Sequence, residues 1–327
     1  MIRPKPEGQL KLGMSGWPLI ALIAVVGFLW TSQQFRWLTI SGVKGLTVLI
    51  ASGDVAVALF LGLTLLLAAA VVRKRFQFGV RALLVLTSVV AVQCDWLGTE
   101  VAAARKQHAL VAEIRRARGR VRYDYMPPPG VALAAVGPPV PAWLRELLGD
   151  DFFANVAEVD LSLASPSKFE LADLESLLGL AELDLGPAFG DAELERISRL
   201  TKLRRLSLDH TSVTDAGLRA IERLTQLESL SLSQTKIGDQ GLMSISHLAH
   251  LQSLFLNQTA ITDLGLQQLK PLRELQNLTL VSTNVSEAGL EQLKCLTKLR
   301  WLGIYGTEIN DPDIVKLQLA FPDCNIR

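Results

Sequence analysis

The sequence predicts an α/β solenoid with a parallel sheet on its concave side and helices on its convex side, preceded by two to three transmembrane helices. Two observations lead to this fold class. A 24-residue repeat fills the second half of the chain, and long apolar runs fill its first hundred residues. The chain has 327 residues, which is enough for two or more units with cores of their own.

The repeat is most regular in its strand segments. LRRLSLDHT, LESLSLSQT, LQSLFLNQT, LQNLTLVST and LRWLGIYGT start 24 residues apart, at Leu203, Leu227, Leu251, Leu275 and Leu299. Weaker copies start at Val156 and Leu180, which gives about seven coils. In LxxLxL the second and third leucines alternate as on a strand, with one side buried. Because a single coil cannot bury its leucines alone, the coils must stack and their strands must form a parallel sheet.

A polar turn and a helix start follow each strand. The helix starts read VTDAGL, IGDQGL, ITDLGL, VSEAGL and INDPDI, with Glu287 as the weaker substitute for aspartate. Pro312 follows Asp311, and proline favours the first helical position. The pattern therefore predicts helix N-caps at Asp215, Asp239, Asp263 and Asp311. A threonine also recurs at each turn, where its hydroxyl is expected to bond backbone groups: Thr211, Thr235, Thr259, Thr283 and Thr307.

Three apolar runs in the membrane region, residues 1–98, predict spans at about 12–30, 46–72 and 78–97. The mean hydropathy of the chain is +0.30, and the apolar excess lies in this region. The basic residues of 73–81 favour a cytoplasmic loop and an extracytoplasmic repeat domain. A later basic cluster at 115–122 opposes this assignment, so the sidedness and the choice between two and three spans stay open.

Residues 99–142 separate the membrane region from the solenoid. They predict a juxtamembrane helix that stops near Gly119, a short strand in RVRYDY and a proline-rich linker. Residues 143–327 are predicted to form the solenoid with an N-terminal cap. Trp143, Leu147 and Leu148 lie on one side of a short helix and are expected to close the open end of the core.

The alternation along each strand predicts which side chains face outward on the concave sheet. These positions are acidic in the early coils, small and polar in the middle, and partly aromatic in the late coils. Exposed aromatic side chains are typical of interaction sites. The predicted partner-binding residues are therefore Asp160, Asp184, Asp209, Phe255, Asn257, Thr279, Val281, Trp301 and Tyr305.

One hypothesis is that Phe255, Trp301 and Tyr305 form a contact patch, with the acidic coils adding electrostatic selectivity. The alternative is that Trp301 and Tyr305 only cover the edge of the last coil.

The sequence carries no pattern of catalytic residues. His210, His247 and His250 lack metal-ligand spacing on one face, and no nucleophile motif or phosphate loop is present. A net charge of +1 gives no field that would attract nucleic acid. We therefore expect no enzymatic activity, no cofactor and no metal. The cysteines are expected to be small buried residues, although pairing of Cys295 with Cys324 stays open.

The repeat resembles the leucine-rich-repeat superfamily over about residues 156–327, in the subtype with TDAGL turns that F-box adaptors also contain. The segments RFQFGVRALLVLTSVVAV, RARGRVRYDY, PAWLRELLGDDFF and FPDCNIR extend this likeness. With them, the chain is similar to membrane-anchored leucine-rich-repeat proteins of planctomycete bacteria. The resemblance implies an integral protein of a bacterial inner membrane. An F-box is absent from the sequence, which argues against a ubiquitin-adaptor role.

Two functions are compatible with this organisation. The first is a membrane-tethered binding module that contacts a protein partner through its concave face. The second is a membrane-embedded signal transducer or transporter subunit whose repeats are regulatory. The second requires polar groups that face one another within the spans, and only Asp54 and Asp95, both near span ends, are acidic there. We therefore expect the first, with a partner and an oligomeric state that the sequence does not identify.

Overall fold

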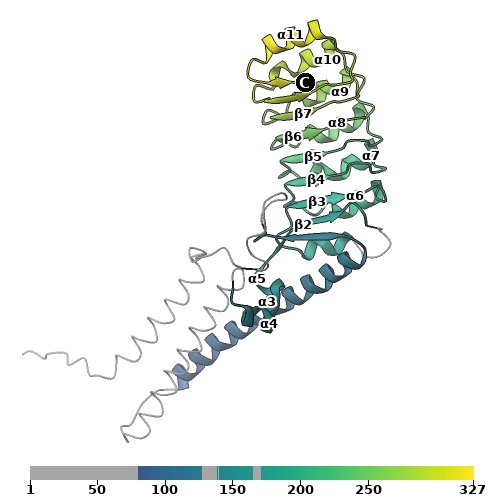
Figure 1. Ribbon diagram of the computed structural model, residues 1–327. Helices are drawn as coiled ribbons and strands as arrows, with labels where there is room; N and C mark the ends of the chain where they lie inside the picture. The colour runs from purple at the N-terminus through teal and green to yellow at the C-terminus, as the bar shows by residue number, and fades with distance from the viewer. Residues whose placement is uncertain (1–79, 127–137, 139, 165–170) are drawn as a thin grey trace, which may run out of the picture. The chain divides into compact units, whose positions relative to one another are not determined.

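The computed structural model of the chain describes residues 80–126, 138, 140–164 and 171–327 (Figure 1). The chain forms two compact units. One consists of Met1–Ala102 and Pro138–Phe153, and the other of Ala103–Gly137 and Ala154–Arg327. The predicted spans at 12–30 and 46–72 lie outside the described residues.

In the first unit, the described elements are the start of helix α3 (Val80–Arg116), helix α4 (Ala142–Leu148) and helix α5 (Asp150–Phe153). The third predicted span overlaps α3, which continues without a break through the predicted juxtamembrane helix. Within the described stretches of the chain, no helix is both long and apolar enough to cross a membrane.

Helix α4 was predicted to close the solenoid core, but none of its side chains is fully buried. Trp143 is 63% exposed and Leu147 is 72% exposed, and both belong with Leu148 to the first unit.

The first coil is instead covered by the end of α3 and by strand β1 (Arg120–Tyr123). Leu110, Val111, Ile114 and Ala117 are buried in the same core as the leucines of the repeat, and so is Tyr123. The second unit therefore supplies its own N-terminal cap.

The turn between α3 and β1 is close-packed. Arg118 takes a left-handed conformation with φ of 70°, and the helix has ended at Arg116. A Cβ at Gly119 would lie 2.6 Å from Ile114 Cγ2 and 2.8 Å from Leu161 Cδ2. Glycine therefore allows the chain to reverse directly against the core.

The strands form one sheet in chain order, with β1 antiparallel to β2 and the remaining pairs parallel. Equivalent leucines lie in register from strand to strand, as the 24-residue spacing predicts: Leu206, Leu230, Leu254, Leu278 and Leu302. The strands after β1 are β2 (Val156–Leu161), β3 (Glu182–Leu185), β4 (Arg205–Ser207), β5 (Ser229–Ser231), β6 (Ser253–Phe255), β7 (Asn277–Thr279), β8 (Trp301–Gly303) and β9 (Asn325–Ile326).

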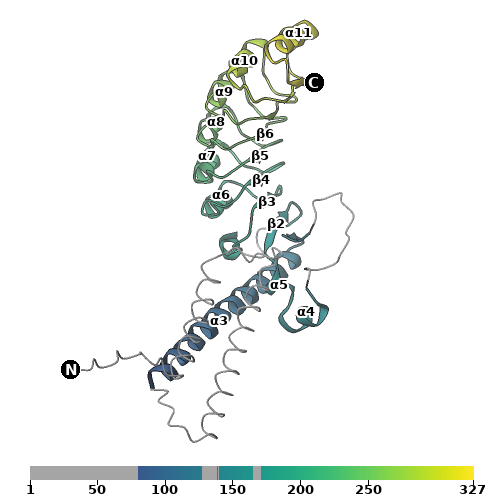
Figure 2. The same ribbon diagram turned by 90° about the vertical axis from the view of Figure 1, so that its left-hand side faces the viewer.

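Short helices stack along the other side of the second unit and bury the predicted apolar face (Figure 2). Leu218, Ile221 and Leu224 are fully buried in one coil, as are the equivalent residues of the next. The predicted α/β solenoid with a parallel sheet is thus confirmed for this unit. Its helical segments are η3 (Leu171–Ser176), α6 (Asp191–Ile197), α7 (Asp215–Leu218), η4 (Arg219–Arg223), α8 (Asp239–Ile245), α9 (Asp263–Leu266), η5 (Gln267–Leu269), α10 (Glu287–Glu291), η6 (Gln292–Cys295) and α11 (Asp311–Ala320).

The predicted N-caps are one residue too late, because each predicted aspartate is the first residue of its helix. The residues at the N-cap position are Thr214, Gly238, Thr262 and Asn310 in place of Asp215, Asp239, Asp263 and Asp311. The Thr262 hydroxyl, for example, accepts a hydrogen bond from the Leu264 amide at 3.3 Å.

The aspartates at 215, 239 and 263 connect neighbouring coils instead. Asp239 accepts hydrogen bonds from both the amide and the hydroxyl of Thr262, at 2.8 and 2.7 Å. Asp215 accepts the Gly238 amide at 2.7 Å. We call this set the aspartate ladder, with the members Asp191, Asp215, Asp239 and Asp263.

The glycine two residues after the start of each of the helices α7, α8, α9 and α10 makes room for the aspartate of the preceding coil. A Cβ at Gly241 would lie 2.6 Å from Asp215 Oδ1, closer than van der Waals contact permits. The equivalent glycines face the preceding aspartate in the same way: Gly217, Gly265 and Gly289. The aspartate and the glycine are therefore two halves of one contact between coils.

The threonine row is confirmed. Each hydroxyl donates to the carbonyl three residues earlier at 2.6–2.7 Å, from Thr211, Thr235, Thr259, Thr283 and Thr307. The residue before each threonine takes a left-handed conformation, which turns the chain away from the strand. These residues are His210, Gln234, Gln258, Ser282 and Gly306.

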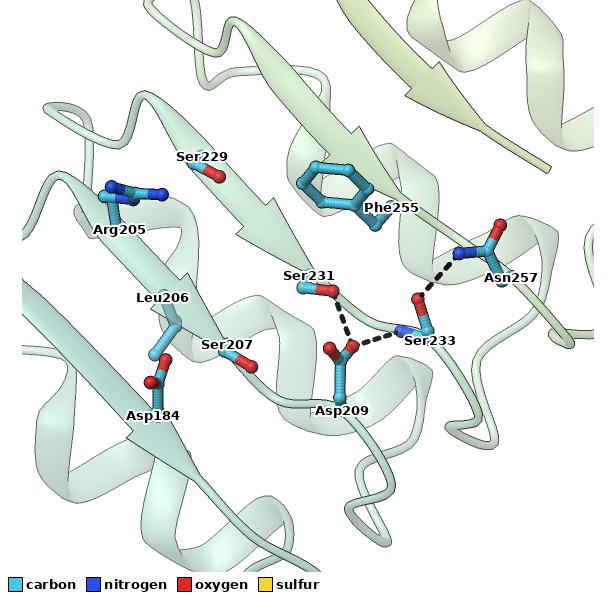
Figure 3. A pocket seen from close by; sticks show the side chains of 10 residues that line it. All are labelled: Asp184, Arg205, Leu206, Ser207, Asp209, Ser229, Ser231, Ser233, Phe255 and Asn257. Carbon is cyan, nitrogen blue, oxygen red and sulfur yellow. Dashed lines mark hydrogen bonds between the residues drawn. The ribbon is translucent and has the colours of Figure 1, made fainter. Parts of the chain in front are cut away.

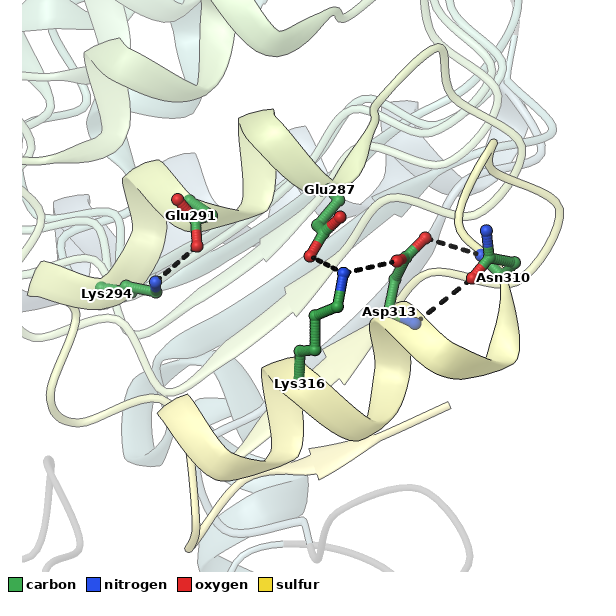
Figure 4. Close-up of polar contacts among 6 residues, drawn as sticks. All are labelled: Glu287, Glu291, Lys294, Asn310, Asp313 and Lys316. Carbon is green, nitrogen blue, oxygen red and sulfur yellow. Dashed lines mark hydrogen bonds and ion pairs between the residues drawn. The ribbon is translucent and has the colours of Figure 1, made fainter.

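The last coil closes differently (Figure 4). Glu287 occupies the helix-start position of α10, and its carboxylate pairs with Lys316 of α11 at 2.9 Å rather than with the backbone of the next coil. Asn310 caps α11 in a capping box with Asp313. Lys316 also lies 3.3 Å from Asp313, and Lys294 of η6 pairs with Glu291 of α10 at 2.6 Å.

Cys295 and Cys324 are both free thiols, so they do not pair in this structure. Cys295 is half-buried, whereas Cys324 lies in the core under α11. Burial raises the pKa of the Cys324 thiol to about 11, which keeps it protonated at neutral pH.

Candidate binding site on the concave sheet

Strand register arranges the outward side chains of the second unit in rows that run across the sheet. We call one of these rows the central row. It starts at the next-to-last residue of β2 and of β3, and it continues through the residues that lie in register with them on the later strands. Its members are Asp160, Asp184, Ser207, Ser231, Phe255, Thr279 and Gly303. The row is acidic at its start, small and polar in its middle, and contains one aromatic ring.

A shallow pocket of about 350 Å³ lies over the middle of this row (Figure 3). It brings together four of the predicted partner-binding residues: Asp184, Asp209, Phe255 and Asn257. The other five are not part of its lining: Asp160, Thr279, Val281, Trp301 and Tyr305. The sequence-based list omitted the remaining lining residues, which are Arg205, Leu206, Ser207, Ser229, Ser231 and Ser233.

One wall of the pocket is a continuous hydrogen-bonded network. Asp209 Oδ1 accepts the Ser231 hydroxyl at 2.5 Å and the Ser233 amide at 2.8 Å. Asn257 donates to the Ser233 hydroxyl at 3.3 Å and accepts the Val281 amide at 3.0 Å. Asp209 and Asn257 were predicted to bind a partner, but their polar groups hold successive coils together. We call these four residues, Asp209, Ser231, Ser233 and Asn257, the bonded wall.

Other polar groups of the pocket are not bonded. Among the residues that the structure describes, the Asp184 carboxylate has no hydrogen-bond or ion-pair partner, and neither do the hydroxyls of Ser207 and Ser229. Burial raises the pKa of Asp184 to about 6, and repulsion by Glu158, Asp160 and Glu182 adds to this shift while Arg205 opposes it. Asp184 therefore lies among other carboxylates and has no direct ion-pair partner within the described structure.

The neighbouring glutamates do have counter-ions. Arg122 of β1 lies 2.5 Å from Glu158 and 3.2 Å from Glu182, and Arg205 lies 3.7 Å from Glu182. Asp160 accepts the amide of Ser162 at 2.9 Å. The repeat pattern could not reveal the role of Arg122, because β1 lies outside the repeat and pairs antiparallel to it.

The three predicted aromatic residues do not share one environment. Phe255 lines the pocket on β6, whereas Trp301 lies two strands away on β8. The Arg327 guanidinium lies over the Trp301 ring, 5.3 Å from its centroid. This contact favours the alternative interpretation for Trp301, which is that it belongs to the closure of the last coil. Tyr305 is 80% exposed.

Within the described ranges, no group of three or more His, Cys, Asp or Glu side chains is arranged to hold a metal ion. His210 occupies a left-handed turn position that recurs in every later coil with another residue type, so its location follows from the repeat.

Comparison with known proteins agrees with this architecture. Residues 161–318 match the family model described as a leucine-rich repeat region. This part of the chain is therefore similar to leucine-rich repeats. Leucine-rich repeat domains are typically protein-binding modules, and solenoids of this kind present an extended concave surface. A search of curated proteins finds no match to the chain.

Two similar solved structures are internalins from Listeria monocytogenes. Internalin C2 is 23% identical, with 54% of this chain and 75% of that chain covered and a TM-score of 0.41. The internalin inlF is 20% identical, with 48% of this chain and 63% of that chain covered and a TM-score of 0.32.

Proposed function

We propose that the leucine-rich repeat region binds a protein partner through its concave sheet. The observation that carries this proposal is the pocket over the central row. Three of its polar side chains, Asp184, Ser207 and Ser229, have no protein partner in the described structure, although the residues of the bonded wall beside them are hydrogen-bonded from coil to coil. Groups left unbonded at a concave surface are available to a ligand. The proposal assigns no catalytic role to the chain.

We also propose that the N-terminal region tethers the repeats to a membrane, as in the membrane-anchored leucine-rich-repeat proteins of planctomycete bacteria that the chain resembles. The apolar runs at 12–30 and 46–72, which lie outside the described residues, support this. The expected location is a bacterial inner membrane with the repeat region outside the cytoplasm.

The anchor is tested by alkaline extraction of membranes that contain the full chain. The sidedness is tested separately by proximity labelling of intact cells. We expect the chain to stay in the membrane fraction and to be labelled by a reagent that does not cross the membrane. Release at alkaline pH would contradict the anchor, and labelling only after lysis would contradict the sidedness.

The binding face is tested by site-specific photocrosslinking in living cells. The photoreactive residue p-benzoylphenylalanine replaces Ser229 on the concave sheet in one variant. In a matched variant it replaces Met243 of α8, which is exposed on the opposite side. We expect discrete protein adducts from position 229 and none from position 243. Equal adducts from both positions, or none from position 229, would contradict the proposal.

A further inference from the structure

The pocket differs in chemistry from one end to the other. Asp184, Ser207, Ser231 and Phe255 occupy the same register position on four successive strands. Neighbouring strands lie ~4.8 Å apart, so the backbone positions of Asp184 and Phe255 are separated by about 14 Å. A carboxylate therefore stands at one end, an aromatic ring at the other, and small hydroxyl side chains between them (Figure 3).

The carboxylate end favours a cation. Asp184 is half-buried and unpaired within the described structure, and the other acidic groups around it are Glu158, Asp160 and Glu182. The adjacent Arg205 does not pair with Asp184, since its guanidinium lies toward Glu182 at 3.7 Å. A lysine or arginine side chain from a ligand would supply the missing counter-charge.

The aromatic end favours an apolar side chain. The ring of Phe255 is half-buried and lines the pocket beside Ser231 and Asn257. The bonded wall fixes the position of both neighbours before any ligand arrives. An apolar group placed on this ring removes its remaining exposed surface from water, and the rigid wall limits the entropy lost on binding.

The distance between the two ends suits an extended polypeptide. Residues four positions apart in an extended strand face the same side and lie about 13 Å apart. The small side chains of Ser207 and Ser231 leave space for a main chain between the two ends. The free Ser207 hydroxyl and the nearby Ser229 hydroxyl can each donate to a peptide carbonyl or accept from an amide.

We propose that the pocket binds an extended polypeptide segment whose lysine or arginine contacts Asp184 and whose apolar side chain, four positions away, contacts Phe255. This specificity rests on the proposed function, because it requires that the concave sheet binds protein. Beyond the proposed function, it names the two side chains that a partner must carry and the residues of the pocket that contact them.

The test is a selection of peptides from a displayed library of random nine-residue sequences, with the full chain in detergent micelles as bait. Four forms of the bait are compared: the natural chain, Asp184→Lys, Phe255→Ser and Glu308→Lys. The last variant is the matched control, because Glu308 is exposed and outside the pocket. Amide hydrogen exchange of each variant verifies that the repeats remain folded.

We expect the natural chain and Glu308→Lys to enrich the same sequences, with Lys or Arg four positions from an apolar residue. Asp184→Lys should reverse the preference to Asp or Glu at that position and weaken the original peptides by about tenfold or more. Phe255→Ser should abolish only the apolar preference.

Two results would overturn the inference, and they differ in what they say of the proposed function. Peptides that require Phe255 but show no preference for a basic residue would refute the proposed specificity and leave concave-face binding intact. Peptides that bind all four forms equally, together with an absence of crosslinks from position 229, would refute both.

Discussion

Four aspartates of the repeat region accept hydrogen bonds, whereas a fifth that is buried to a similar extent accepts none from the residues that the structure describes. Asp191, Asp215, Asp239 and Asp263 form the aspartate ladder on the turns between the sheet and the helices, and each accepts hydrogen bonds from the next coil. Asp184 on the concave sheet is also half-buried, yet it has no bonding partner in the described structure. The difference separates carboxylates that hold coils together from one that is available to a ligand.

The largest loss of stability is expected when an aspartate of the ladder is replaced. Asp239→Ala removes two hydrogen bonds to a charged group and leaves the Thr262 amide unpaired, so the free energy of unfolding should fall by ~3 kcal/mol. Urea unfolding of the full chain measures the change. Glu222→Ala provides the control, because Glu222 is exposed on η4 and should leave the midpoint unchanged.

The glycine half of the same contact should give the next largest effect. In Gly265→Ala the new methyl group would meet Asp239 Oδ1 and approach Leu242 Cδ1 at 3.1 Å, which should cost ~2 kcal/mol. In an Asp239→Ala background the same substitution should cost less than ~1 kcal/mol, because its main obstacle is gone. Additive costs in this double-mutant cycle would show that the aspartate and the glycine are not one contact.

A smaller loss is expected at the threonine row. Thr259→Val removes the hydrogen bond to the Leu256 carbonyl but keeps the volume of the side chain, so stability should fall by ~1 kcal/mol. Hydrogen exchange of the amides around residue 259 should report the change locally. Thr225→Val, at an exposed threonine outside the row, should have no comparable effect.

The smallest change in stability is expected at the concave carboxylate, and its sign depends on pH. The pKa of Asp184 is raised from its ordinary 3.8 to about 6, so the folded chain binds the proton more tightly than the unfolded chain does. The tighter proton binding stabilises the folded chain. This stabilisation is fully present below about pH 3.8 and is lost as the pH rises through 6. Asp184→Asn should therefore match the natural chain at pH 3.5 and be slightly more stable, by ~0.5 kcal/mol, at pH 7.

Binding should show the opposite pH dependence. Peptides with a basic residue should bind the natural chain more weakly as the pH falls through 6, because a protonated Asp184 no longer attracts a cation. In Asp184→Asn the affinity should be low and flat over the same range. Fluorescence anisotropy with one selected peptide measures both affinities, and an equal slope in the two proteins would show that Asp184 does not cause the pH dependence.

The sequence was sufficient to predict the strand register and the threonine row. The spacing of the leucines predicted the register of Leu206, Leu230 and Leu254, and the threonine row followed from the same phase. Both features recur identically in each coil, so the residue pattern of a single repeat is enough to predict them.

Contacts between coils were harder to predict. Asp239 was assigned to its own helix, although its partner Thr262 lies 23 residues away in the next coil. Asp209 and Asn257 face the concave side as predicted, but alternation alone did not indicate that neighbouring coils would use their polar groups. The role of Arg122 depends on an antiparallel strand that no repeat spacing reveals.

The two ends of the stack of coils are held by different contacts. At the boundary of the last coil, Glu287 reaches an exposed lysine, Lys316, instead of the backbone amide that each ladder aspartate holds. Buried side chains cover both ends, Ile114 and Tyr123 at the N-terminal end and Leu317 and Phe321 at the C-terminal end, so the two ends differ in the bonds between coils. In a stack where each coil is held only by its neighbours, opening starts at the weaker terminus. Under mechanical load or mild denaturant, the coils should therefore peel off one by one from the C-terminal end.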